Sequence, residues 1–147
     1  MLERHCNEVV SFEPYRPLFK FNAYQFRKCA NIKVVNDKSD DGLEPILSKI
    51  KGNVSFWLDG HFSGDGTFGD LSTASPIIHG LEVIETWIRS GGKAWIAIDD
   101  ARLFTGNHGY PSVSVVLDFA ERNNLIAYKC MDIFFLTELP LGDDASH

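Results

Sequence analysis

Four apolar runs along the chain stop at an acidic residue. They are EVVSFEP, which stops at Glu13, IKVVND at Asp37, VSFWLDG at Asp59, and KAWIAIDD at Asp99 and Asp100. Short runs of this kind, rich in Val, Ile, Phe and Trp, are typical of strands buried in a parallel sheet. The pattern therefore predicts four strands, each with an acid at its carboxyl end.

The segments between these runs carry apolar residues at helical spacing. In each segment the apolar positions fall on one face of a helix, as expected for crossovers that lie on a sheet. The four sets are Phe19, Ala23, Phe26 and Ala30; Leu43, Ile46, Leu47 and Ile50; Ile77, Leu81, Ile84 and Ile88; and Val113, Val116, Leu117 and Ala120. Pro17 and Pro111 are typical of helix starts, and Gly91-Gly92 of a left-handed helix end.

The last apolar stretch, LIAYKCMDIFFLTEL, is too short for another crossover. It predicts two short strands that meet in a hairpin near Met131 and Asp132. A chain of 147 residues with 44% apolar content suits a single core, so we expect one domain over residues 1–147. The expected fold is α/β, with a Rossmann-like, doubly wound, mostly parallel sheet and a C-terminal antiparallel hairpin.

In such a sheet the strand-end acids would share one edge, where open α/β sheets bind their ligands. An acidic edge suits ribose hydroxyls, an amine or a divalent cation, and it repels bare phosphate. Asp59, Asp99 and Asp100 follow two strands that should be adjacent, so their oxygens could bind magnesium or calcium. The alternative is that Asp100 caps the next segment while Asp99 pairs with Arg102.

Two further strand ends carry polar side chains that suit a nucleoside. Glu13 stands where a carboxylate can accept hydrogen bonds from two ribose hydroxyls, although the position also suits the start of a helix. Asp37 and Ser39 could contact an adenine edge, although NDKSDDG is equally good turn chemistry.

The loop DGHFSGDGTFGD, which spans Asp59 to Asp70, follows the third strand and carries four glycines. Such a loop can bring its backbone close to a ligand or can simply be solvated surface. His61 could remove a proton from a substrate hydroxyl, and His108 is a second candidate base. Five aromatic residues could wall a pocket, although aromatic residues next to strands are more often core: Trp57, Phe62, Phe68, Phe104 and Tyr110. The loop contains neither a P-loop nor a strand-to-helix GxGxxG motif.

Charge and cysteine usage narrow the class of protein. The net charge of −6 argues against sequence-independent binding to nucleic acid, which needs a basic surface. No stretch approaches the ~20 apolar residues of a membrane helix, so we expect no membrane partner. Three cysteines without CxxC spacing indicate reduced thiols in a cytoplasmic protein rather than a zinc site.

The same residues resemble a known family. The runs EVVSFEPYRPLFKFNAYQF, NIKVVNDKSDDGLEPIL, FWLDGHFSG and AWIAIDDARLF resemble the second to fifth strands of class I S-adenosylmethionine-dependent methyltransferases, over almost the whole chain. The resemblance implies that Glu13 binds the ribose of S-adenosylmethionine and that Asp37 and Ser39 lie near its adenine.

Within the family, LDGH and IDD are similar to the magnesium-dependent O-methyltransferases. This similarity implies a metal site at Asp59, Asp99 and Asp100, and methyl transfer to a metal-bound hydroxyl of a small molecule or sugar. The catalytic lysine of the catechol methyltransferases is replaced in DGHF, so His61 would act as the base beside Asp59.

The family's first strand and glycine-rich turn have no counterpart, since only LERHCN precedes the Glu13 strand. The fold is therefore expected to be truncated at its N-terminus, with the central position of the sheet unfilled. Three outcomes are open: the neighbouring strands close up, another chain supplies a strand, or the chain is a fragment. Strand donation in a homo-oligomer is the repair we favour.

These observations support two main hypotheses. The first is a methyltransferase-like enzyme that uses S-adenosylmethionine, with Mg²⁺ as a candidate second cofactor. The second is a truncated, inactive relative that serves as an interaction or scaffold module. A metal-dependent hydrolase ranks last, because the chain has no GxSxG nucleophile motif.

Overall fold

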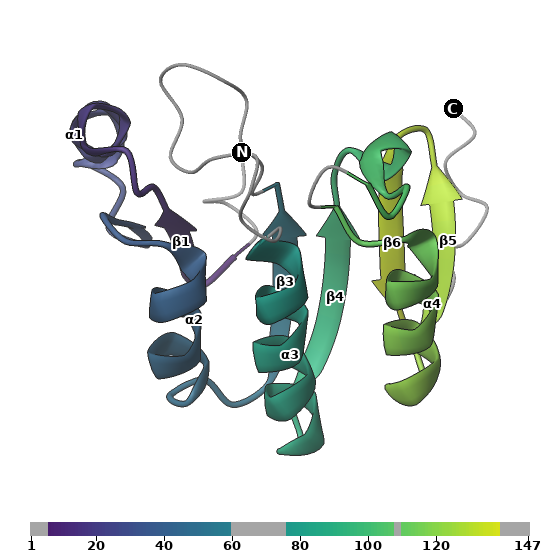
Figure 1. Cartoon of the computed structure of the whole chain (residues 1–147). Helices are drawn as coiled ribbons and strands as arrows, with labels where there is room; N and C mark the ends of the chain where they lie inside the picture. Colours follow the sequence, from purple (N-terminus) through teal and green to yellow (C-terminus); the bar gives the residue numbers. More distant parts are fainter. Residues whose placement is uncertain (1–5, 60–75, 108–109, 139–147) are drawn as a thin grey trace, which may run out of the picture.

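A computed structural model describes residues 6–59, 76–107 and 110–138 of the chain (Figure 1). Strands and helices alternate and then give way to a closing hairpin, as predicted. The elements are β1 (Val9–Phe12), α1 (Arg16–Phe26), β2 (Ile32–Val35), α2 (Ser39–Leu47), β3 (Asn53–Leu58), α3 (Pro76–Arg89), β4 (Lys93–Ile98), the 3-10 helix η2 (Ala101–Leu103), α4 (Val113–Arg122), β5 (Ile126–Cys130) and β6 (Ile133–Thr137).

The strands form two sheets instead of the single sheet that the sequence predicts. One sheet is the parallel pair β1-β2, and the other has the order β3-β4-β6-β5. In the larger sheet β3 and β4 are parallel, while β6 is antiparallel to both of its neighbours. The α/β class, the parallel strands and the C-terminal hairpin are therefore confirmed, and the continuity of the sheet is corrected.

The two sheets are divided between β1 and β3, and we call the space between these two strands the break. Figure 1 shows these two strands on either side of the break, with their arrowheads pointing the same way as that of β4. Of the three outcomes left open by the sequence, closing up of the neighbouring strands does not occur, because β1 and β3 belong to different sheets.

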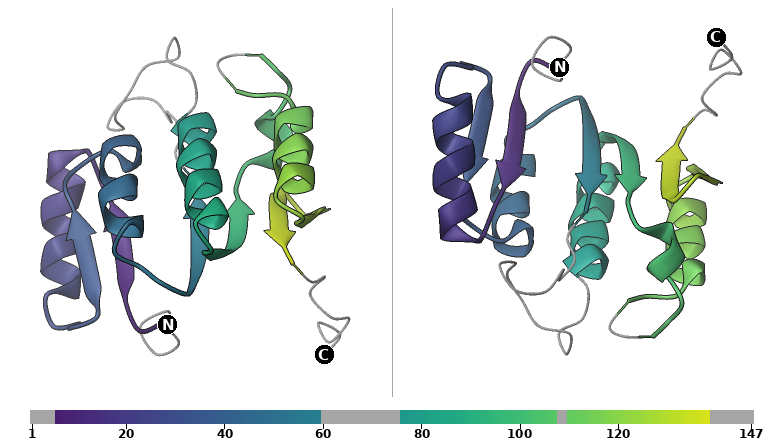
Figure 2. Two further views of the ribbon diagram at one scale, coloured as in Figure 1. Left: turned by 90° about the horizontal axis from the view of Figure 1, so that it is seen from below. Right: turned by 90° about the horizontal axis from the view of Figure 1, so that it is seen from above.

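The helices are arranged on both sides of the strands. In Figure 2, α2, α3 and α4 lie on one side of the strands: α3 and α4 cover the larger sheet, α2 lies beside α3 and over β1, and α1 lies on the side of β1-β2 away from α2. The core lies under the three covering helices; its most deeply buried large side chains are Phe119, Ile84, Ile98, Leu136 and Val116. Burial of these apolar surfaces supplies most of the stabilisation of the fold.

The other face of the larger sheet carries large side chains that are partly open to solvent. Trp57 is 58% exposed and Trp95 is 47% exposed. Phe135 stacks on Tyr128 of the neighbouring strand, with ring centroids 5.3 Å apart. Both tryptophans alternate with residues that point into the core, as the period of a strand requires.

Helix ends differ from the predicted spacing at two places. The helix α1 ends at Phe26 and α2 ends at Leu47, so Ala30 and Ile50 lie beyond them. Beyond both helices the backbone turns through shorter i→i+3 bonds, such as those from the Cys29 N–H to the Phe26 carbonyl at 2.9 Å and from the Ile50 N–H to the Leu47 carbonyl at 3.0 Å. The left-handed stop is confirmed at Gly91, whose φ is 100°, and the hairpin turn at Met131, whose φ is 52°.

The glycine at position 92 makes room for an indole that joins α3 to the start of β3. A Cβ at Gly92 would lie 2.4 Å from Trp87 Cδ2, which is far inside van der Waals contact. The Trp87 indole N–H donates to the Ile50 carbonyl at 3.3 Å, and its ring meets Phe56 edge-on. The turn before β4 therefore depends on the absence of a side chain at this position.

We predict that Gly92→Ala lowers the free energy of unfolding by about 1–3 kcal/mol, because Trp87 must move. The matched control is Gly80→Ala in α3, where a Cβ meets nothing within 4 Å. That change should stabilise the protein by about 0.5–1 kcal/mol through helix propensity. Chemical denaturation measures both, and equal effects of the two changes would contradict the packing role of Gly92.

Glu85 in α3 accepts hydrogen bonds from the end of α4. Its Oε1 accepts hydrogen bonds from Arg89 at 2.9 Å, from Arg122 at 3.2 Å and from Asn123 at 3.3 Å. The hydrogen bond and charge of Arg122, together with Arg89, hold the pKa of Glu85 below its ordinary value, against the opposing effect of burial.

We predict that Glu85→Gln lowers the free energy of unfolding at pH 7 by about 0.5–1 kcal/mol, since both arginines are largely exposed and screened. A carboxyl with a lowered folded pKa stabilises the protein above its ordinary value of 4.5, and this stabilisation is lost as the pH falls through the folded pKa. The difference between wild type and variant should therefore vanish in acid. Glu82→Gln, at a carboxylate that is 68% exposed, is the control and should show little difference at either pH.

Candidate functional site

Three acids stand at the carboxyl ends of β1, β3 and β4. Leu58 is in register with Ile98, and the Asp99 N–H donates to the Leu58 carbonyl at 3.0 Å, so the ladder continues past both strands. Asp59 and Asp99 therefore follow adjacent strands at the same level, as predicted. Glu13 follows β1, on the other side of the break in the sheet.

The Glu13 carboxylate is only partly engaged. Its Oε1 accepts the Tyr15 N–H at 2.9 Å, and the side chain is partly buried. Among the described residues no hydrogen bond to the second oxygen occurs. That oxygen is available to a ligand hydroxyl, which is the chemistry that the sequence predicts for this position.

Asn36 fixes the backbone around Glu13. Its side-chain amide donates to the Glu13 carbonyl at 2.9 Å and to the Pro14 carbonyl at 3.2 Å. This residue was not predicted from the sequence, because an asparagine before Asp37 is also typical of an ordinary turn. It links the ends of β1 and β2 and fixes the backbone that carries the Glu13 side chain.

Asp37 and Ser39 flank the start of α2. Asp37 Oδ1 accepts the Lys38 N–H at 2.9 Å, and Ser39 is the first residue of the helix. Both therefore lie at the same edge as Glu13. Their contact with an adenine ring stays a prediction.

Asp100 is neutralised by an arginine. Its carboxylate lies 2.7 Å from the Arg102 guanidinium, which also pairs with Asp132 in the hairpin turn. Asp99 instead uses Oδ1 to accept the Asp100 N–H at 2.8 Å. The alternative to a metal site is therefore wrong in its partners: Arg102 pairs with Asp100 and not with Asp99. Asp100 stands at the N-cap of η2 with a left-handed backbone, φ 56°, but its side chain makes no capping hydrogen bond.

The arginine links the hairpin to the acidic edge. The Arg102 N–H donates to Asp132 Oδ1 at 2.8 Å, and the Ala101 N–H donates to the Asp132 carbonyl at 2.8 Å. Hydrogen bonding to Asp132 and the charges of both aspartates raise the pKa of Arg102. Burial works to raise the pKa of Asp132, but its bonds to Arg102 outweigh this effect and lower it.

Tyr110 faces the same edge. Its hydroxyl is buried and has no hydrogen-bond partner among the residues that the structure describes. Burial, followed by the charges of Asp100 and Asp59, raises the pKa of Tyr110. The phenol therefore stays protonated beside the acids, where it can donate a hydrogen bond.

The residues present do not fit the predicted magnesium site. In the ranges 6–59, 76–107 and 110–138, no three His, Cys, Asp or Glu side chains group as metal ligands. The Asp100 carboxylate is paired with a guanidinium, which occupies an oxygen that a cation would need.

The remaining predicted site residues are the two candidate bases and four aromatic residues. The candidate bases His61 and His108 lie outside the described residues, as do Phe62 and Phe68 of the glycine-rich loop. Phe104 is 3% exposed and belongs to the core, where it meets Tyr110 edge-on. Trp57 lies on the open face of the sheet.

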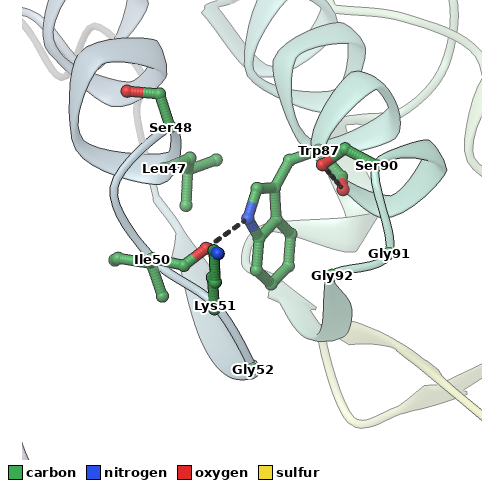
Figure 3. Close-up of a pocket in the computed structure, with 9 residues that line it drawn as sticks. All are labelled: Leu47, Ser48, Ile50, Lys51, Gly52, Trp87, Ser90, Gly91 and Gly92. Carbon is green, nitrogen blue, oxygen red and sulfur yellow. Dashed lines mark hydrogen bonds between the residues drawn. The ribbon is translucent and has the colours of Figure 1, made fainter.

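A pocket of 320 Å³ lies at the opposite edge of the larger sheet (Figure 3). Trp87 forms its wall, and the turns before β3 and β4 form its rim; it is lined by Leu47, Ser48, Ile50, Lys51, Gly52, Trp87, Ser90, Gly91 and Gly92. It lies at the amino ends of the strands, away from the acids. The pocket therefore does not belong to the predicted site.

Comparison with known proteins bears on the fold. No protein-family model and no curated protein matches the sequence. The structure is similar to a solved structure described as a putative rRNA-methylase from Clostridium thermocellum, with a TM-score of 0.51 and 14% identity, over 88% of this chain and 73% of that chain. This likeness shows that the two chains share an α/β, Rossmann-like fold.

None of the helices in the described part of the chain is long and apolar enough to cross a membrane.

We predict that Asp100→Asn lowers the pKa of Tyr110 toward its ordinary value, because a negative neighbour is removed and Arg102 is left with one fewer partner. Asparagine tolerates the left-handed backbone of this position, so the fold should persist. The control is Asp37→Asn, at the end of β2 in the other sheet. A pH titration of ¹³C-labelled tyrosine followed by NMR checks both, and an unchanged Tyr110 in Asp100→Asn would refute the electrostatic contact.

Proposed function

We propose that the chain is a methyltransferase-like protein that binds S-adenosylmethionine at its acidic edge and transfers the methyl group to a small-molecule or sugar hydroxyl. The observation that carries the proposal is Glu13. A partly buried carboxylate at the end of a parallel strand, with one oxygen left for a ligand, suits a pair of ribose hydroxyls. The fold likeness supports the same class.

The donor would supply an electrophilic methyl group on a sulfonium. Glu13 would bind and orient its ribose, and Asn36 would hold the backbone that carries Glu13. Asp37 and Ser39 would lie beside the adenine. His61 as the base that takes the hydroxyl proton stays a prediction, and no step is assigned to magnesium.

An RNA acceptor is the main competitor to a small hydroxyl compound. The similar structure is described as a putative rRNA-methylase. For this chain, a net charge of −6 weakens attraction to a phosphate backbone, since such binding is driven by release of counterions from basic contacts. We therefore favour a small neutral acceptor.

The divided sheet supports a second candidate, a methyltransferase-like scaffold module that does not bind the donor. The break lies beside Glu13 and Asp59, where the family's glycine-rich turn would hold the methionine part of the donor. Such a module would keep the fold without the activity.

Calorimetric titration with S-adenosylmethionine and its demethylated product tests the proposal. Glu13→Gln should weaken binding about tenfold or more, because a charge-assisted hydrogen bond is lost. Glu8→Gln, the same change at the amino end of β1, should leave the affinity unchanged. No binding by folded wild-type protein at millimolar ligand would favour the scaffold instead.

A further inference from the structure

The edge of β1 that faces the break offers unpaired backbone groups. The Val9 N–H bonds to the Asn31 carbonyl at 2.8 Å, and the Glu13 N–H bonds to the Val35 carbonyl at 2.9 Å. In a parallel ladder, alternate residues direct their N–H and C=O groups to opposite sides. The backbone groups of Val10 and Phe12 therefore point away from β2 and toward the break.

The edge of β3 that faces the break is unpaired in the same way. The Gly52 carbonyl accepts from Lys93 at 3.2 Å, and the Leu58 carbonyl accepts from Asp99 at 3.0 Å, so the even-numbered residues of β3 face β4. The backbone groups of Ser55 and Trp57 face the break. Within the described ranges, no hydrogen bond reaches these groups or those of Val10 and Phe12 from that side.

The surroundings of the break are apolar on both sides of the sheet. On the helix-covered side, the Phe12 ring packs so closely on α2 that a Cβ at Gly42 would lie 2.3 Å from Phe12 Cε1. On the open side, Trp57 is 58% exposed beside the break. A segment that occupied the break would bury apolar side chains on both faces, which is typical of a central parallel strand.

We propose that the break between β1 and β3 binds one β-strand of a separate polypeptide, apolar on both faces and parallel to both neighbours. Two edges that point the same way can both pair with one parallel strand (Figures 1 and 2). Recognition by addition of a strand uses main-chain hydrogen bonds for affinity and side-chain packing for selectivity.

A second copy of the chain is a poorer occupant than a separate polypeptide. Every strand in the described part of the chain already pairs with a neighbour. A copy that donated one of them would break a ladder of its own to complete another. The proposal does not depend on methyl transfer, because it rests on the backbone of β1 and β3 alone.

Amide hydrogen exchange, read by NMR on the full chain at low concentration, tests the proposal. The probe is a peptide of six alternating Val and Ile residues flanked by lysines, and its control is the same peptide with N-methylated alternate amides. The first peptide should slow exchange at Val10, Phe12, Ser55 and Trp57 by about tenfold or more. The N-methylated peptide should slow none of them.

A proline variant separates backbone pairing from side-chain adhesion. Ser55→Pro removes an N–H that faces the break and leaves the hydrogen bonds to β4 intact, so the protein should fold. In this variant the peptide should no longer slow amide exchange. In Ser55→Ala, which keeps the N–H, the peptide should still slow it. Amides already protected in the dilute protein, protection that appears only at high concentration without peptide, or no protection with millimolar peptide would each overturn the proposal.

Discussion

Backbone pairing is the constraint on which the arrangement of this molecule depends. A strand inside a sheet has N–H and C=O groups on both sides, and each unpaired group that is withheld from water costs free energy. The parallel ladder between β3 and β4 meets this requirement and places Asp59 beside Asp99 at the ends of the two strands. Between β1 and β3 the requirement is unmet, and the sheet divides there.

The electrostatics of the carboxyl edge follow from where each acid is held. Glu13 keeps an oxygen for a ligand, whereas Asp100 is neutralised by an arginine that is anchored in the β5-β6 turn. Tyr110 remains protonated among these charges. The edge is thus a hydrogen-bonding surface suited to hydroxyls, and it is less acidic than its sequence implies.

Much of the fold was predictable because its signals are local. Periodicity identified the strands and helices, and the hairpin at Met131 and the stop at Gly91 follow from turn chemistry. The position of Asp59 beside Asp99 follows from the adjacency of the two parallel strands that they end.

The rest depends on contacts that no local pattern encodes. The pairing of Arg102 with Asp100 and Asp132 joins residues thirty positions apart through a left-handed backbone. The role of Asn36 depends on the approach of β1 to β2. The break itself was anticipated from a missing strand, but only the strand order shows that the neighbours do not close over it.

The most direct test of the divided sheet is an NMR measurement of amide–amide nuclear Overhauser effects across the strands. Adjacent strands lie about 4.8 Å apart, within range of the effect, whereas strands separated by an unfilled position lie about 10 Å apart. The division predicts cross-strand effects for β1 with β2 and for β3 with β4, and none for β1 with β3. Effects that join Val10 or Phe12 to Ser55 or Trp57 in the protein alone would contradict it.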